Sequence, residues 1–180
     1  EAILIEALLL AEQQGNDAAR AGILNNLGNL YAAQGQHERA QEVYTQGLDL
    51  AQRTGLAAEA ARLMANAGIS AGAAGRYVRA EAHNARALEA LPGVSDRREK
   101  AYLLITVGQT DEKILPHLPE SRDRLLLRAC DSYRSALALA RRTGDRRLQS
   151  HALGSLGGLY ELEQRADEAL RLTRQAAFLA

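Results

Sequence analysis

Apolar and small residues recur every three or four positions along almost the whole chain, and no stretch alternates apolar and polar residues as a half-buried strand does. Gly, Thr-Gly pairs and Pro interrupt this pattern at short intervals, and these residues commonly end helices. The pattern therefore predicts an all-α fold with no strand and about nine helices. The predicted helices span about residues 1–14, 18–33, 37–53, 57–73, 77–91, 96–115, 121–142, 146–162 and 165–179.

Polar residues stand where several of these helices are predicted to begin. Asn16 or Asp17 can cap the second helix, and Asp145 can cap the eighth, because their side chains accept hydrogen bonds from unpaired N–H groups of a first turn. Asp96 followed by Glu99 has the spacing of a capping box. Most connections are short, and short connections make consecutive helices antiparallel neighbours.

Glycines inside the predicted helices reveal a repeat. Gly28, Gly68 and Gly108 follow one another at intervals of 40 residues, and Gly157 comes 49 residues after Gly108. A Gly inside a helix costs about 1 kcal/mol relative to Ala, so another part of the chain is expected to pass close to each one. A small residue downstream, such as Ala40 for Gly28, is the expected neighbour.

The repeat divides the chain into one predicted array covering residues 1–180. An excess of nine residues in the third repeat lies at 115–123, a segment that contains two prolines, and it is read as an insertion. Insertions in repeat proteins usually lie on one face, often the binding face. The predicted units are the second helix of a truncated repeat at 1–15, and full repeats at 18–55, 57–93, 96–144 and 146–180.

Charge is balanced over the whole chain but not along it. The 22 basic and 22 acidic residues give a formal net charge of zero, which argues against a nucleic-acid or membrane-surface ligand. Residues 1–60 carry a net charge of −5, residues 61–120 of +1 and residues 121–180 of +4. We interpret the charges as solvated helix faces; the alternative is a graded field that orients a partner.

The residue types that carry catalysis and metal binding are scattered. Cys130 is the only cysteine, which excludes an internal disulfide and favours a reducing, cytoplasmic location. No pair of His or Cys residues has the spacing of metal ligands on one helix, and no glycine-rich loop follows a strand to hold a phosphate. No run reaches the roughly 18 apolar residues of a membrane span. We therefore predict no catalytic residue, no metal site, no cofactor and no membrane contact.

The repeat resembles the tetratricopeptide repeat (TPR) family, in which a helix-turn-helix unit carries Leu-Gly, then an aromatic residue, then Ala. The first full repeat has Leu27-Gly28, Tyr31, Ala40 and Tyr44, and the later repeats have related residues, although Asp111 replaces the aromatic residue in the third. The 40-residue period is similar to the long-repeat subgroup of Pins/LGN-type and kinesin light chain scaffolds. The resemblance implies a right-handed α-solenoid of antiparallel helix pairs and five core tyrosines: Tyr31, Tyr44, Tyr77, Tyr133 and Tyr160.

The resemblance also implies a concave groove lined by the first helix of each repeat. At the equivalent positions, glycine and alanine form much of the expected floor, including Gly22, Gly154 and Gly158. The larger side chains expected to contact a partner are Asn25, Asn26, Asn29, Arg62, Asn66, Ile69, Tyr102, Gln109, Glu112 and His151.

Asparagine is concentrated on the first two of these helices, although helix interiors disfavour it. In long-repeat scaffolds, asparagines at the position matching Asn26 and Asn66 hold a peptide backbone; Thr106 and Ser155 replace them in the later repeats. The alternative is that the asparagines are solvated or bond an inter-repeat loop. The lysines of a clamp for a C-terminal carboxylate are absent.

The sequence thus favours a protein-interaction scaffold that binds a peptide or helical segment of a partner. One alternative is the regulatory or sensor arm of a larger bacterial multidomain enzyme or transcription regulator, because both ends look cut from a longer array. The other is self-association into a homo-oligomer through uncapped ends, since a solenoid needs polar caps.

Overall fold

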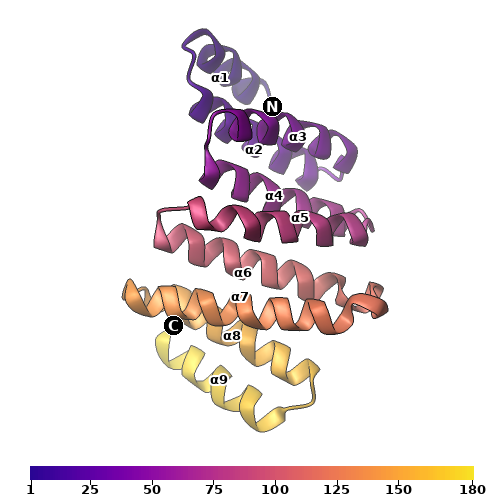
Figure 1. The fold of residues 1–180 in the computed structure, drawn as a ribbon, viewed down its shortest axis with the longest axis vertical. Coiled ribbons are helices and arrows are strands. Elements are labelled where there is room, and N and C mark those ends of the chain that lie inside the picture. The colour runs from indigo at the N-terminus through magenta and orange to yellow at the C-terminus, as the bar shows by residue number, and fades with distance from the viewer. The chain divides into compact units, whose positions relative to one another are not determined.

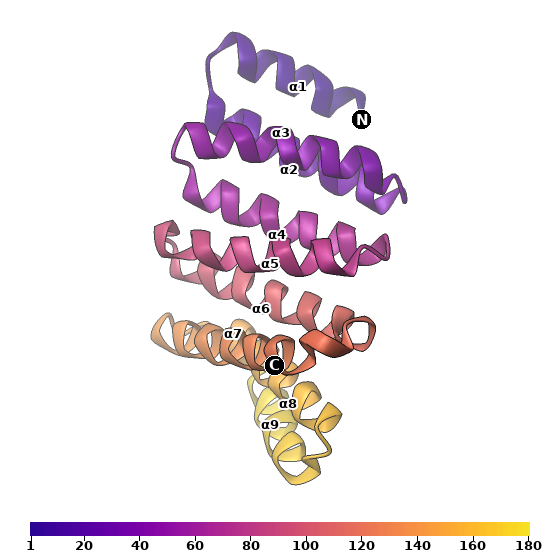
Figure 2. The same ribbon diagram turned by 45° about the vertical axis from the view of Figure 1, so that its right-hand side comes forward.

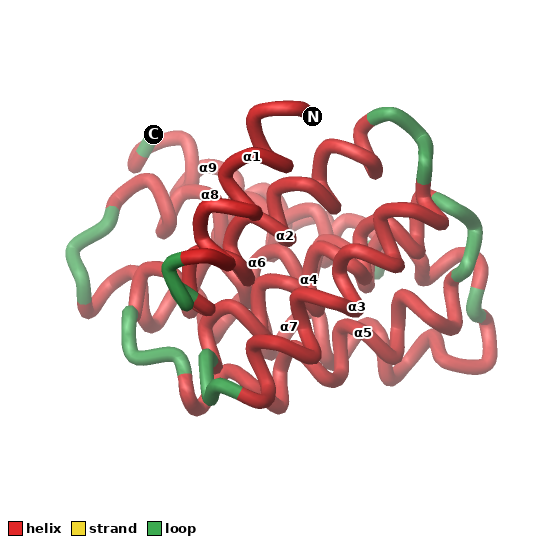
Figure 3. The backbone as a smooth tube through the Cα atoms, turned by 90° about the horizontal axis from the view of Figure 1, so that it is seen from above, coloured by secondary structure: helices red, strands yellow, loops and turns green.

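The computed structural model describes residues 1–180, and every regular element in it is helical (Figures 1 and 3). This confirms the predicted all-α fold of nine α-helices. Short 3₁₀ turns follow α5 and α6 at Leu91–Gly93, Leu115–His117 and Pro119–Ser121. The helices are α1 Ala2–Gln13, α2 Asp17–Ala33, α3 His37–Arg53, α4 Ala57–Ala73, α5 Tyr77–Ala90, α6 Arg97–Ile114, α7 Arg122–Arg142, α8 Arg146–Leu162 and α9 Ala166–Leu179.

The capping residues lie where the sequence places them. The side chain of Asn16 accepts a hydrogen bond from the Ala19 N–H at 3.0 Å, and Asp145 accepts one from Leu148 at 3.0 Å. Asp96 accepts two, from the first turn of α6. Since these oxygens satisfy N–H groups that have no partner inside a helix, each cap sets the first residue of its helix.

Turn residues with positive φ end most of the helices. The last turn is closed by a residue with φ between +62° and +73° after α1 to α4 and α7, and each of these residues is glycine. After α8 the corresponding residue is Gln164, with φ +60°. A side chain in this left-handed region approaches its own backbone too closely, so Gln164 is the one non-glycine residue with this strain.

The chain divides into two compact units, residues 1–93 and 94–180. In the first, α2 pairs with α3 and α4 with α5, while α1 packs on α2 and α3 on α4. In the second, α6 pairs with α7 and α8 with α9, and α7 packs on α8. Figures 1 and 2 show the antiparallel course of successive helices within each unit. The proposed division into four repeats of one array stays a prediction.

Each repeated glycine lets a side chain of the following helix pack directly against the helix that carries the glycine. A Cβ on Gly28 would lie 2.4 Å from the Tyr44 ring, and a Cβ on Gly108 would lie 2.6 Å from the Tyr133 ring. At Gly28 the ring of Tyr44, one turn beyond Ala40, is the nearest neighbour. At Gly68 and Gly157 the backbone carbonyls of the alanines twelve positions downstream, Ala80 and Ala169, also lie 3.5 and 3.4 Å from an added Cβ.

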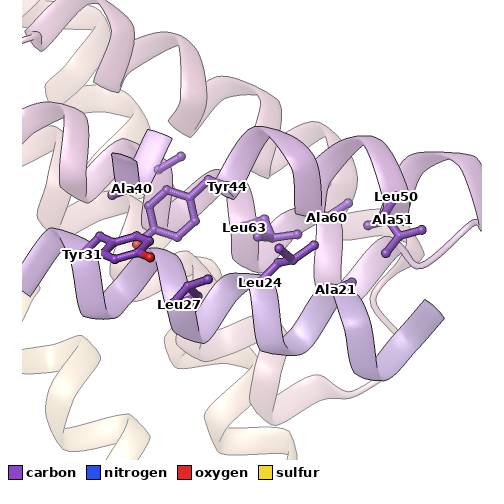
Figure 4. Packing of buried hydrophobic residues seen from close by; sticks show 11 residues of the cluster. Ala21, Leu24, Leu27, Tyr31, Ala40, Tyr44, Leu50, Ala51, Ala60 and Leu63 are labelled. Carbon is purple, nitrogen blue, oxygen red and sulfur yellow. The ribbon is translucent and has the colours of Figure 1, made fainter. Parts of the chain in front are cut away.

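The core of the first unit is continuous from α2 to α4. Figure 4 shows Tyr31 and Tyr44 at one end of a cluster of buried apolar residues and Ala21, Leu50 and Ala51 at the other. Of the five tyrosines expected in the core, Tyr31, Tyr44 and Tyr133 are buried. The other two are only half-buried: Tyr77 and Tyr160.

A buried ion pair replaces the missing aromatic residue of the third repeat. Asp111 is fully buried, and its two carboxylate oxygens accept hydrogen bonds from Nε and Nη2 of Arg128 at 2.6 Å each. Tyr31 stands at the same distance after its repeat glycine, and Arg39 donates to its hydroxyl and lies over its ring at 4.1 Å. Arg128 directly precedes Ala129, and Arg39 directly precedes Ala40, so the two arginines occupy the same position of their repeats. The partner of the arginine is a tyrosine ring in the first repeat and a carboxylate in the third.

Replacing Gln164 with Gly is expected to stabilise the chain by about 0.5–1 kcal/mol. Left-handed strain of about 1–2 kcal/mol is removed, which outweighs the roughly 0.4–1 kcal/mol of extra chain entropy that Gly loses on folding. Urea unfolding measures the change. Gln34→Gly serves as control, since Gln34 has φ −86° and no strain to relieve; equal effects of both substitutions would contradict the explanation.

Removing one member of the buried pair is expected to cost more than removing both. Arg128→Leu leaves the Asp111 carboxylate buried without the Arg128 guanidinium and should lower the free energy of unfolding by about 3–5 kcal/mol. The double variant Asp111→Leu/Arg128→Leu leaves no buried charge and should lose less. Denaturant unfolding of both variants decides the matter, and a double variant less stable than the single one would be the contrary result.

Candidate functional site

The asparagines of the first unit have two different structural roles. Asn25 is only 5% exposed, and its Oδ1 accepts a hydrogen bond from Nδ2 of Asn66 at 2.8 Å. This bond joins α2 to α4, so Asn25 makes a contact between two helices and not with an inter-repeat loop. Asn25 is therefore closed to a partner in this structure, and Asn66 is partly occupied.

Asn26, Asn29 and Ile69 are the exposed members of the predicted set in the first unit. The Asn29 Oδ1 accepts a hydrogen bond from the Tyr44 hydroxyl at 2.7 Å, which orients the amide. Arg62 is half-buried and lies 3.9 Å from the Glu59 carboxylate. We call these side chains of α2 and α4 the polar face of the first unit; its amides can donate and accept hydrogen bonds, as contact with a peptide backbone requires.

In the second unit, residues of α6, α8 and α9 line a groove of about 850 Å³. The sequence predicts four partner-binding residues in this unit, and three of them line the groove: Gln109, Glu112 and His151. Tyr102 does not line the groove, although it is 58% exposed. The groove is lined by Gln109, Glu112, Lys113, Ser150, His151, Gly154, Ser155, Gly158, Leu162, Thr173, Ala176 and Ala177.

Hydrogen bonds order the polar side of this groove. The Gln109 Nε2 lies 3.0 Å from Nε2 of His151 and 3.5 Å from the Ser155 hydroxyl. Glu112 accepts a hydrogen bond from the Tyr133 hydroxyl at 2.8 Å.

Burial is the main influence on the Glu112 carboxyl. It raises the pKa of Glu112 above the ordinary value of 4.5, while the Tyr133 hydroxyl and then Lys113 act in the opposite direction. Burial likewise raises the pKa of Tyr133, so the phenol remains a donor at neutral pH. Burial therefore disfavours the charged form of the Glu112 carboxyl group in this groove.

The floor glycines differ physically from the packing glycines. A Cβ added at Gly154 or Gly22 would meet no atom within 4 Å, and one at Gly158 would meet only Glu112 Oε1 at 3.7 Å. Because Gly weakens a helix by about 1 kcal/mol relative to Ala, packing inside the chain gives no reason for these three. They leave open space on the faces of α2 and α8.

Sequence reasoning missed the contribution of α9. Thr173, Ala176 and Ala177 line the same groove, but the family resemblance assigns grooves to first helices, and α9 is a second helix. Small residues on α9 carry no signal that separates groove lining from helix packing.

A further groove, of about 760 Å³, lies between α3 and α5 and was also missed. Arg76, Arg79, His83 and Arg86 line it from α5, and Glu38 and Glu42 are among those that line it from α3. The spacing of these cations on one helix face is a signal in the sequence. Burial lowers the pKa of His83, and the nearby Arg86 and Arg79 lower it further.

No group of three or more His, Cys, Asp or Glu side chains is placed to hold a metal ion. None of the helices combines the length and apolar character that crossing a bilayer requires. Cys130 is half-exposed on α7.

Substitution of Glu112 by Gln tests the electrostatics of the groove. Because the folded-state pKa of Glu112 lies above 4.5, its contribution to stability is full below that pH and is lost as the pH rises through the raised value. Gln cannot ionise and still accepts the Tyr133 hydrogen bond. The stability of the variant relative to the parent should therefore increase from acidic to neutral pH in urea unfolding; a difference independent of pH would refute this assignment.

Comparisons with known proteins bear on the fold and the family. The chain is similar to the crystal structure of BtubC (BKLC) from P. vanneervenii, with a TM-score of 0.75 and 21% identity over 99% of this chain and 70% of that one. At this identity the likeness concerns the fold alone. A search of curated protein sequences found no significant match.

The family model described as tetratricopeptide repeat matches residues 1–53 and 20–93, which together cover more than half of the chain. Its matched residues include the packing glycines, tyrosines and turn glycines of the first two full repeats. Repeats of this kind generally mediate contacts between proteins. The chain belongs to the tetratricopeptide repeat family.

Proposed function

We propose that this chain is an interaction scaffold that binds a peptide or helical segment of a protein partner. The binding faces are those of the first helix of each repeat. The observation that carries the proposal is the groove of the second unit, in which Gln109, Glu112 and His151 meet above Gly154 and Gly158. Its volume of about 850 Å³ lies within the usual range of ligand-binding clefts.

The chemistry of the groove suits a peptide backbone. Gln109, Ser155 and His151 offer donors and acceptors on one side, while Ala176, Ala177 and Leu162 supply apolar surface. The open space over Gly154 lets a backbone approach α8 closely. Hydrogen bonds from side chains combined with a small-residue floor support an extended or helical ligand rather than a compact small molecule.

The polar face of the first unit is proposed as a second contact region. Asn26 and Asn29 are exposed there and can bond a backbone, and Ile69 is an apolar anchor point. The long-repeat subgroup uses asparagine in this way, and its resemblance to this chain supports the assignment of Asn26. Asn25 is better understood as the residue that holds Asn66 in place.

The regulatory-arm alternative would use the same surfaces in a larger protein. A sensor arm of a multidomain enzyme or transcription regulator needs a ligand groove, and its catalytic residues would lie elsewhere. Self-association also stays a prediction; it is favoured by the exposed apolar residues Ile3, Leu9 and Leu10 of α1, on a face that α2 leaves uncovered.

Leucine substitutions at the open glycines test the proposal. Peptides are first selected from a random library displayed on phage against the unmodified chain, then synthesised, and their affinities are measured by fluorescence polarisation. Gly154→Leu should weaken groove-bound peptides roughly tenfold or more, equivalent to about 1.4 kcal/mol, because the side chain fills the groove. Gly22→Leu should do the same for peptides bound on the first unit.

The design separates loss of binding from loss of fold. Leu is a better helix former than Gly, and neither position has an atom within 4 Å of the added Cβ, so both variants should remain folded. Ala138→Leu, on an exposed position of α7, is the matched control and should bind normally. Peptides that bind both glycine variants as tightly as the parent chain would exclude these faces as the site.

A further inference from the structure

Arginines gather at one edge of the second unit, where α6 and α8 begin and α7 and α9 end. We call these residues the arginine edge. Contacts bring the helix ends together: Arg98 Nε lies 3.5 Å from Asp145, and Arg146 donates to the carbonyl of Phe178 at 3.1 Å. The arginine edge consists of Arg97, Arg98, Arg141, Arg142, Arg146, Arg147 and Arg174, all exposed.

Few acids balance this charge. The acidic residues at these helix ends are Asp96, Glu99 and Asp145, and Asp96 and Asp145 accept hydrogen bonds from helix N–H groups as caps. Only Arg98 reaches one of them as an ion pair. The arginines with no carboxylate partner within 4 Å are Arg97, Arg141, Arg142, Arg147 and Arg174.

At the opposite ends of the same helices, two arginines are paired with carboxylates. Arg122 bonds Glu163, and Arg165 bonds Glu168. Asp167 lies beside Glu168 in the first turn of α9. The two edges of the second unit therefore differ in charge. Arg122 and Arg165 at the opposite edge are paired with carboxylates, whereas most arginines of the arginine edge are not.

Helix stability does not explain the arginine edge. Arg141 and Arg142 are favourable at the C-terminus of α7, but Arg97 and Arg98 open α6, and Arg146 opens α8, where the helix dipole is positive and cations are disfavoured. The first turn of α8 contains no acidic residue at all. These positions raise the positive potential at the edge at a cost to the helices.

We propose that the arginine edge binds an acidic segment of a protein partner, rich in Asp and Glu, at a site separate from the grooves. Guanidinium groups present fixed pairs of N–H donors that match carboxylates. The opposite edge, with Asp167 and its neighbours, would orient such a segment by repulsion.

The surroundings of the arginines favour a peptide over a phosphate backbone. Arg141 and Arg174 flank a small cavity of about 350 Å³ whose lining includes Leu153, Phe178 and Leu179. An acidic segment that also carries an apolar residue can fill this cavity, whereas a nucleic-acid backbone would leave it empty. The zero net charge of the chain also gives a long polyanion no general attraction.

The probe is a fluorescein-labelled synthetic peptide of repeated Glu-Glu-Leu units, titrated with the full chain at low salt and at about 0.15 M salt. The edge variant is Arg141→Gln/Arg142→Gln/Arg146→Gln/Arg147→Gln. Its affinity should fall at least about tenfold, since several charge contacts are lost together. The parent affinity should fall as salt increases.

The control variant removes the same charge elsewhere: Arg53→Gln/Arg124→Gln/Arg134→Gln/Arg171→Gln, all exposed positions. It should bind within about twofold of the parent, which separates a local site from net charge. If the fourfold edge variant fails to fold, the pairs Arg141→Gln/Arg142→Gln and Arg146→Gln/Arg147→Gln supply the same comparison separately.

Three results would overturn the proposal. One is the absence of peptide binding to the parent chain, and another is an equal loss in the edge and control variants. The third is tighter binding of duplex DNA or of phosphatidylserine vesicles that depends on the same arginines, which would assign the edge to another class of ligand. A peptide of repeated Lys-Lys-Leu units should not bind.

Discussion

The fold depends on one repeated contact: a side chain from the second helix of a pair lies across a glycine of the first. Tyr44 over Gly28 and Tyr133 over Gly108 are its clearest cases, and any Cβ at these glycines would overlap the ring. The same position is filled by Asn84 over Gly68 and by Thr173 over Gly157. Because the contact sets how closely two helices approach, the alanines one turn earlier, the buried tyrosines and the short connections follow from it.

Variation around this contact is tolerated where another interaction takes over. In the third repeat Asp111 stands where Tyr31 stands in the first, and the buried bidentate pair with Arg128 occupies the place of a ring stacked under Arg39. Such a pair is worthwhile only when both carboxylate oxygens are satisfied, since a buried charge without a partner is costly. Repeats can therefore keep their geometry while exchanging aromatic packing for electrostatics.

The surfaces proposed for binding are the parts that this packing does not require. Gly22, Gly154 and Gly158 weaken their helices and contact nothing that needs a glycine, and the arginines that open α6 and α8 oppose the helix dipole. Gly22 and Gly154 have no compensating contact inside the chain, and among these arginines Arg98 reaches Asp145 and Arg146 the Phe178 carbonyl, whereas Arg97 has no carboxylate within 4 Å. We propose ligands as the reason for both features, a peptide backbone over the glycines and carboxylates against the arginines.

The sequence by itself determined the all-α fold, the helix limits and the capping residues, because these depend on local periodicity and on single turns. It also identified Gln109, Glu112 and His151 as neighbours, since a repeat places equivalent positions on one face. The tertiary structure alone decided that Asn25 is buried against Asn66, that Thr173 and Ala177 of α9 line the groove, and that Arg128 neutralises Asp111. These depend on which side chains of different helices meet, and that is set by packing distances between helices, which no spacing along the chain encodes.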